Sequence, residues 1–109
     1  MKKQDTLENL VNYAYLAIGS NLGKKIFNLV NAKYKLSKNG LQIIKSSSFY
    51  VTRSWPNPNF PNYINAVLFA KTNLSLPKLF RKIKLIEKSL GRVNTPKNYP
   101  RKCDIDIID

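Results

Sequence analysis

The fold of this chain is decided by a strand that runs into a helix in residues 63–91, YINAVLFAKTNLSLPKLFRKIKLIEKSLG. Residues 63–72 are typical of a strand and follow a loop in which Pro and Asn alternate. Ser75 is a favourable helix N-cap, and Pro77 suits the first helical turn. Apolar residues recur at helical spacing before Gly91: Leu76, Leu79, Phe80, Ile83, Ile86 and Leu90. This segment predicts a strand followed by an amphipathic helix.

A similar pair of elements precedes this segment. Residues 13–18 form a short apolar run rich in β-forming residues, which predicts a strand. Ser20 or Asn21 is expected to cap the helix that follows, and Asn-Gly at residues 39–40 predicts its end.

Two further strands complete the pattern. Residues 41–54 are expected to form one long strand, and residues 103–108 a short one. The order strand, helix, strand, strand, helix, strand predicts an α+β fold. We expect a ferredoxin-like β-α-β-β-α-β sandwich, with an antiparallel or mixed sheet and both helices on one face.

Length and composition limit the possible functions. A chain of 109 residues allows one domain, expected over residues 12–109, with residues 1–11 as a flexible N-terminal extension. The absence of His excludes mechanisms that use imidazole. The single Cys103 excludes an internal disulfide and a CxxC motif, and it agrees with a reducing compartment. Polar residues interrupt the N-terminus before a signal peptide can form, so we expect a cytoplasmic protein.

The net charge of +13 predicts an anionic partner, such as nucleic acid, a nucleotide or a membrane surface. Most of the 19 basic residues are scattered lysines rather than arginines, which nucleic-acid readers favour. A solvated basic surface without a specific partner is the competing interpretation.

Three of the six acidic residues fall in the last six positions. Asp104 and Asp106 alternate with isoleucines, so on a strand both carboxylates project from one face. Their Cα atoms then lie about 7 Å apart, and a cation between them relieves their repulsion. Oxygen ligands without His or Cys favour Mg²⁺. Alternatively, the acids simply pair with basic neighbours, and Arg101 and Lys102 suit either a salt bridge or a phosphate clamp.

Other candidate residues have competing interpretations. The glycine-rich stretch at residues 19–25 lacks the Walker A spacing and predicts a tight turn instead. Tyr63 and Asn65 share one strand face, which suits either a flat heteroaromatic ring or an ordinary sheet edge. Trp55 is either a lid residue or packs on the sheet, and Glu87 is expected to pair with surrounding basic residues on its helix.

Four stretches of the chain together resemble the 6-hydroxymethyl-7,8-dihydropterin pyrophosphokinase family of folate biosynthesis. They occur in order and with compatible spacing over nearly all of residues 13–109. The stretches are YLAIGSNLG at 15–23, SFYVT at 48–52, PNYINA at 61–66 and PRKCDIDII at 100–108.

This resemblance implies transfer of diphosphate from ATP to the hydroxymethyl group of the pterin, with release of AMP. It implies that Asp104 and Asp106 hold two Mg²⁺ ions and that Arg92 and Arg101 are the catalytic, phosphate-binding arginines. The implied pterin-binding residues are Thr52, Arg53, Trp55, Tyr63 and Asn65. The implied ATP-binding residues are Lys84, Glu87, Arg92 and Arg101. Two mobile loops, 53–62 and 92–100, are expected to close over the substrates.

The sequence also departs from the family. Asn98 and Tyr99 stand where members usually carry other residues, and members continue beyond the final strand, whereas this sequence ends at Asp109. The C-terminal part of the family fold is therefore expected to be missing, either because the sequence is a fragment or because the protein is a truncated relative. For a truncated relative we expect weak or absent turnover. The partners implied are ATP and the pterin, with neither nucleic acid nor membrane, and a monomer. The alternatives are a basic ferredoxin-like RNA-binding module and a catalytically weak remnant.

Overall fold

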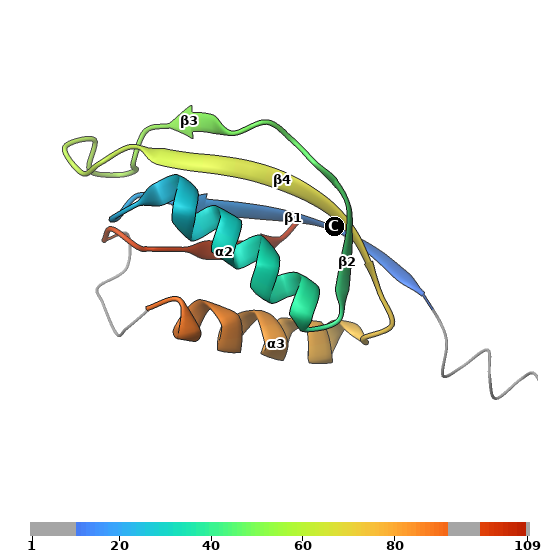
Figure 1. Cartoon of the computed structure of the whole chain (residues 1–109). Helices are drawn as coiled ribbons and strands as arrows, with labels where there is room; N and C mark the ends of the chain where they lie inside the picture. The colour runs from blue at the N-terminus through green and yellow to red at the C-terminus, as the bar shows by residue number, and fades with distance from the viewer. Residues whose placement is uncertain (1–10, 92–98, 109) are drawn as a thin grey trace, which may run out of the picture.

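The computed structural model describes residues 11–91 and 99–108. Within these residues the chain forms two helices and five strands (Figure 1). In chain order they are β1 (Asn12–Ser20), α2 (Lys25–Lys38), β2 (Leu41–Ser46), β3 (Tyr50–Thr52), β4 (Tyr63–Thr72), α3 (Leu76–Ser89) and β5 (Asp104–Ile107). The fold is therefore α+β, as the sequence predicts.

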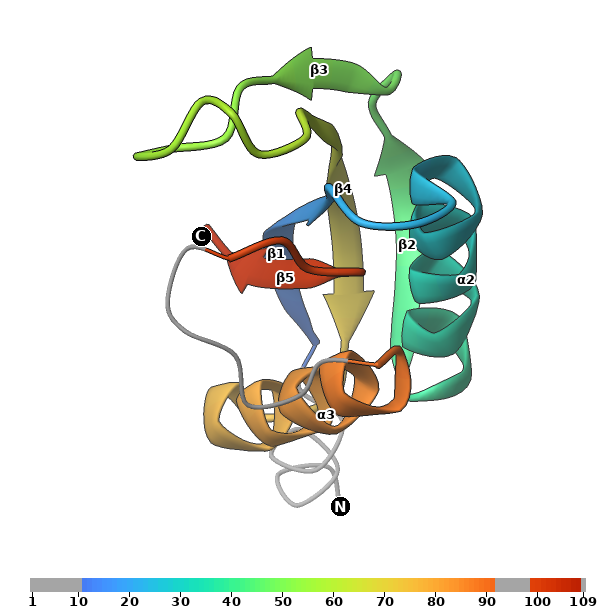
Figure 2. The same ribbon diagram turned by 90° about the vertical axis from the view of Figure 1, so that its left-hand side faces the viewer.

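All five described strands belong to one sheet, and every pairing in it is antiparallel. The strand order is β2-β4-β1-β5, and β3 pairs with β4 beyond the end of β2 (Figures 1 and 2). In the central strand β1, Gly19 lies opposite Asn65 on one side and Asp104 on the other. This register brings residues that are far apart in the sequence to one end of the sheet.

The hydrophobic core lies between the sheet and the two helices. Alternate residues of the central strands, such as Leu16 and Leu68, are fully buried. They belong to one cluster with buried residues of both helices: Leu29, Ala32, Leu36, Leu79, Ile83 and Ile86. Both described helices therefore cover the same face of the sheet, and the alternate residues of the strands point to the opposite face.

The two helices differ in how well their starts were predicted. The Ser75 hydroxyl accepts a hydrogen bond from the Lys78 backbone N–H at 3.4 Å, so the predicted cap of α3 is confirmed. The predicted cap of α2 is wrong, because this helix begins at Lys25 and its N-cap residue, Lys24, makes no side-chain cap bond. Each described helix has 14 residues, and neither is long and apolar enough to cross a membrane.

The single strand expected over residues 41–54 is also wrong, because the structure divides it into β2 and β3. Residues 47–49 belong to neither strand. Here the Ser47 hydroxyl accepts a hydrogen bond from the Val67 N–H at 2.8 Å, in place of a ladder carbonyl. A serine hydroxyl that bonds the backbone of the adjacent strand interrupts the regular pairing, and the alternation of apolar residues does not reveal this.

Candidate active site

The two carboxylates of β5 lie on the sheet face opposite the helices. Asp104 and Asp106 flank Ile105, which is buried in the core, and pair with Gly19 and Ala17 of β1. Both aspartates line one pocket of about 200 Å³ at the ends of β1, β3, β4 and β5. Two carboxylates in one small pocket create a local negative charge in a strongly basic protein.

Arg101 lies beside the first of these carboxylates. Its Nη1 donates to both oxygens of Asp104, at 3.0 and 3.3 Å. Their side chains are 18% and 22% exposed, so solvent screens this ion pair less than one on the open surface. The Nε of Arg101 is buried and donates no hydrogen bond within the described residues. The guanidinium therefore keeps a donor that the described residues do not use.

Glu87 of α3 bonds the strand β5 from the helix-covered side of the sheet. Its side chain is only 2% exposed, and Oε2 accepts a hydrogen bond from the Ile105 N–H at 2.7 Å. Lys84 lies 3.6 Å from Oε1, so the expected pairing with a basic neighbour exists. The pattern of basic neighbours does not indicate, however, where this side chain points. The Glu87 carboxylate is buried and bonds the backbone between the two aspartates.

Gly19 leaves space for the side chains on the other side of the pocket. A Cβ at this position would lie 2.8 Å from Asn65 Oδ1 and 3.3 Å from Tyr63 Cδ1. The Asn65 amide nitrogen donates to Thr52 Oγ1 at 2.9 Å and to the Tyr50 carbonyl at 3.2 Å. These two bonds fix the amide orientation, with Oδ1 over the backbone of β1.

The pocket therefore combines two sets of groups, one suited to a flat polar ring and one suited to a cation. Its lining residues are Ala17, Ile18, Gly19, Thr52, Tyr63, Asn65, Asp104 and Asp106. Of the residues predicted from the sequence, the structure brings together Thr52, Tyr63 and Asn65 with the two aspartates. An aromatic ring, an oriented amide and a hydroxyl can bind a flat polar ring, and the carboxylates can bind a cation.

Other predicted residues lie outside this lining. Trp55 is 78% exposed in the loop after β3, and Arg53 beside it is exposed. The Lys84 side chain is 52% exposed on α3. Arg92 lies outside the described residues.

The donor set of the pocket fits magnesium. In the described part of the chain, no group of three or more His, Cys, Asp or Glu residues is placed to hold a metal. Mg²⁺ usually takes only one or two protein carboxylates and completes its shell with water and substrate phosphates. Asp104 and Asp106 can therefore hold Mg²⁺ when a phosphate ligand supplies further oxygens.

Comparison with known proteins matches most of the chain to one family. Residues 15–109 match the family described as 7,8-dihydro-6-hydroxymethylpterin-pyrophosphokinase (HPPK). The chain belongs to the HPPK family. This match covers every element described above except the first part of β1.

Individual relatives extend the comparison. The chain is 43% identical over 94 residues to a 2-amino-4-hydroxy-6-hydroxymethyldihydropteridine pyrophosphokinase of Aquifex aeolicus, covering 86% of this chain and 58% of the relative. It is 33% identical over 96 residues to the pyrophosphokinase of the same description from Synechocystis, covering 87% of this chain and 49% of the relative. A folic acid synthesis protein, fol1, of Pneumocystis carinii is 33% identical over 108 residues, or 99% of this chain and 14% of the relative. The chain thus spans about half the length of the two single-enzyme HPPK relatives.

Sequence reasoning missed two residues that shape this pocket. The sequence places Gly19 in a turn, but its missing Cβ leaves room for Asn65. Asn21 was expected to cap a helix, but it is buried and bonds Ser54, Pro61 and Arg101. These partners lie 33 to 80 residues away in the chain, so no local sequence pattern could identify them.

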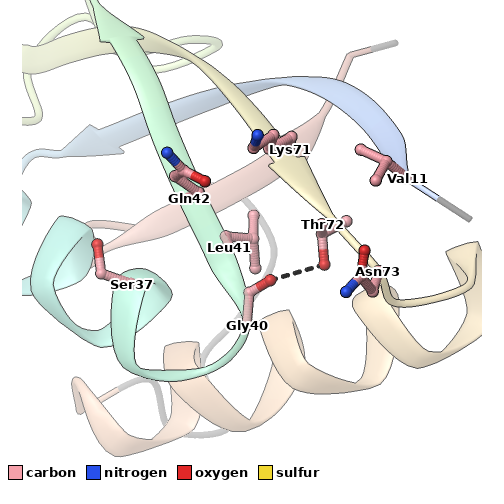
Figure 3. Close-up of a pocket in the computed structure, with 8 residues that line it drawn as sticks. All are labelled: Val11, Ser37, Gly40, Leu41, Gln42, Lys71, Thr72 and Asn73. Carbon is pink, nitrogen blue, oxygen red and sulfur yellow. Dashed lines mark hydrogen bonds between the residues drawn. The ribbon is translucent and has the colours of Figure 1, made fainter. Parts of the chain in front are cut away.

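A second pocket, of about 440 Å³, lies at the other end of β4 (Figure 3). Here the Thr72 hydroxyl donates to the Gly40 carbonyl at 2.7 Å (Figure 3). Lys71 is the one charged residue among the described residues that line it, and none of them is a carboxylate. This pocket therefore lacks the paired carboxylates and the oriented amide of the pocket at β5.

Proposed function

We propose that this chain carries the diphosphate-transfer site of an HPPK enzyme in folate biosynthesis. The reaction moves diphosphate from ATP to 6-hydroxymethyl-7,8-dihydropterin and releases AMP. One observation carries the proposal: paired carboxylates and an oriented Asn65 with Tyr63 and Thr52 line a single small pocket. Family membership supports the same chemistry.

On the phosphate side, Asp104 and Asp106 hold Mg²⁺, with two ions proposed from the family resemblance. The metal supplies charge neutralisation on the phosphate oxygens. Arg101 adds a fixed positive charge beside Asp104, and its buried Nε is a donor suited to a phosphate oxygen. Arg92, outside the described residues, is proposed as a second phosphate-binding arginine, and Lys84 and Glu87 as residues on the nucleotide side.

On the pterin side, the oriented Asn65 amide is suited to the polar edge of the ring. The Tyr63 ring provides an apolar surface beside it, and Thr52 contributes a hydroxyl that already holds Asn65 in place. Arg53 and Trp55 are proposed to join this side from the loop that follows β3. Their exposure leaves them accessible to a ligand.

The chemistry needs little covalent help from the protein. The pterin hydroxyl oxygen attacks the β-phosphorus and loses its proton, while the bond from that phosphorus to the bridging oxygen of AMP breaks. Catalysis then depends on bringing hydroxyl and phosphorus into line, neutralising charge and excluding water. A chain without His and with one buried Cys can supply these functions.

The remaining assignments follow from this function. We assign the sheet to the ferredoxin-like class on its strand order, β5-β1-β4-β2, and treat residues 12–109 as one domain. A cytoplasmic monomer is proposed, although a related bifunctional protein of Pisum sativum is described as mitochondrial.

The test is release of AMP from Mg²⁺-ATP in the presence of the pterin alcohol. The Asp106→Asn variant should lose this activity while keeping the far-ultraviolet circular dichroism of the parent protein. Lys71→Gln, at the second pocket, is the matched control and should keep it. Equal activity in the Asp106→Asn variant would contradict the assignment.

RNA binding is a second candidate function, favoured by the aromatic side chains on the helix-free face. Tyr13 and Tyr15 are 59% and 45% exposed. Tyr13 stacks on Phe69 with ring centroids 5.7 Å apart, and Tyr15 packs against the same ring in a tilted arrangement at 4.8 Å. Together with the net charge of +13, these rings could stack on bases. RNA affinity that falls steeply with salt and survives Asp106→Asn, without AMP release, would favour this function.

A further inference from the structure

Asn21 connects the two halves of the proposed site. It follows the last residue of β1 and is 1% exposed. Its Nδ2 donates to Ser54 Oγ at 2.9 Å and to the Pro61 carbonyl at 3.2 Å. Its Oδ1 accepts from the Arg101 N–H at 2.8 Å, and its own N–H donates to the Arg101 carbonyl at 3.1 Å.

These contacts use both amide protons and the amide oxygen of one side chain. The Ser54 hydroxyl also donates to the Pro61 carbonyl at 2.5 Å, so the two ends of the 53–62 loop meet at Asn21. Inside a protein such a network is strong when complete, and each group left without a partner is costly. The network therefore has one preferred geometry.

The two segments joined here carry different parts of the site. The loop 53–62 lies between Thr52 and Tyr63, which line the ring-binding side of the pocket. Arg101 bonds Asp104 on the carboxylate side. A displacement of either segment relative to β1 changes the separation between ring-binding and phosphate-binding groups.

We propose that Asn21 is a positioning residue that sets the separation between the pterin-binding loop and the phosphate-binding strand. The naming of the two halves rests on the proposed function, whereas the connection itself does not. Asn21 is not among the residues that line the pocket, and it acts through Ser54, Pro61 and Arg101. Substituting this amide should therefore alter the ring-binding and the phosphate-binding sides together.

Two substitutions separate the two sides of the connection. Asn21→Ala removes every side-chain bond. Asn21→Asp keeps an oxygen that can accept from the Arg101 N–H but loses the Nδ2 donors to Ser54 and Pro61, with almost no change in shape. The matched control is Asn28→Ala, because Asn28 bonds Ser20 and Leu22 nearby but neither segment.

The first measurement is amide hydrogen exchange in the free protein, which needs no ligand. Asn21→Ala should raise exchange in both the 53–62 loop and residues 99–103. Asn21→Asp should raise it mainly in the loop, and Asn28→Ala in neither. Unchanged exchange of both segments in Asn21→Ala would overturn the proposal, even if ligand binding were never observed.

The second measurement is affinity for the pterin and, separately, for a non-hydrolysable ATP analogue with Mg²⁺. Asn21→Ala loses two side-chain hydrogen bonds on the loop side and one to Arg101, so both affinities should weaken about tenfold, whereas Asn21→Asp should weaken only the pterin affinity. A residue with a purely structural role would lower the unfolding midpoint and leave both dissociation constants of the folded protein unchanged. That result would overturn the proposal. If the parent protein bound neither ligand, the proposed function would fail while the exchange measurement still decided the connection.

Discussion

The two faces of the sheet differ in this protein, because one packs in the core and the other lines a pocket. On the covered face, Leu16 and Leu68 belong to one buried hydrophobic cluster with residues of both helices. On the opposite face, the same strands present Gly19, Asn65 and the aspartates of β5 to one small pocket. The period of two along each strand keeps stability on one face and ligand chemistry on the other. Substitutions on the covered face should therefore lower the free energy of unfolding, whereas substitutions on the opposite face should lower ligand affinity.

The largest expected effect comes from the covered face. Leu68→Ala should lower the free energy of unfolding by about 3 kcal/mol, because it leaves a cavity in a fully buried cluster. Its neighbour on the opposite face gives the matched control, and Val67→Ala should cost only about 1 kcal/mol. Urea denaturation measures both. Equal losses of unfolding free energy in the two variants would contradict the assignment of the hydrophobic core to one face of the sheet.

Glu87 tests the point where the two faces meet, since it lies in the core but bonds the strand that carries the aspartates. Glu87→Leu should cost about 2 kcal/mol, because the buried Ile105 N–H loses its acceptor. It should also raise hydrogen exchange at Ile105 and weaken binding of Mg²⁺ with an ATP analogue.

Glu87→Gln is the control for this prediction, because its amide oxygen can still accept from the Ile105 N–H. The glutamine variant should stay much closer to the parent protein in both stability and affinity. If glutamine and leucine were equally damaging, the charge of Glu87 rather than its bond to β5 would be what matters.

The smallest change in stability is expected on the open face, at Gly19. Gly19→Ala places a Cβ 2.8 Å from Asn65 Oδ1, so we expect pterin affinity to fall about tenfold with little loss of stability. Gly23→Ala should lower stability and leave the pterin affinity unchanged. Gly23 has a φ of 74°, which strains alanine, and the nearest atom to its Cβ is 3.8 Å away on Asn28. Pterin titration and thermal unfolding of both variants would separate the two effects, and a Gly19 variant with unchanged pterin affinity would remove Asn65 from the proposed site.

Much of the division between the buried face and the pocket-lining face of the sheet could be predicted from local sequence. The strand at 63–72, the Ser75 cap and the alternation of Asp104, Ile105 and Asp106 each leave a pattern within a few residues, because strand and helix periodicity act over that range. The shared face of the two aspartates, inferred from spacing, agrees with their common pocket.

The remaining features depend on long-range contacts. Ser47 ends β2 by bonding Val67, and Asn21 is bonded to residues in two distant segments. In the sequence, both residues are ordinary polar positions, and Asn21 even suits a helix cap. The bond from Glu87 to β5 is hidden for a similar reason, since the basic neighbours on its helix indicate only the Lys84 pair, while the Ile105 N–H lies 18 residues along the chain.

The most direct test of the central claim is calorimetric titration with a non-hydrolysable ATP analogue, with Mg²⁺ and with EDTA. The parent protein should bind more tightly with Mg²⁺, and Asp106→Asn should lose most of that difference. The sign is informative, because Asp106→Asn raises the net charge of +13 by one, and general electrostatic attraction would then strengthen nucleotide binding. Weaker Mg²⁺-dependent binding would support the carboxylates as metal ligands. Unchanged or tighter binding would contradict the account.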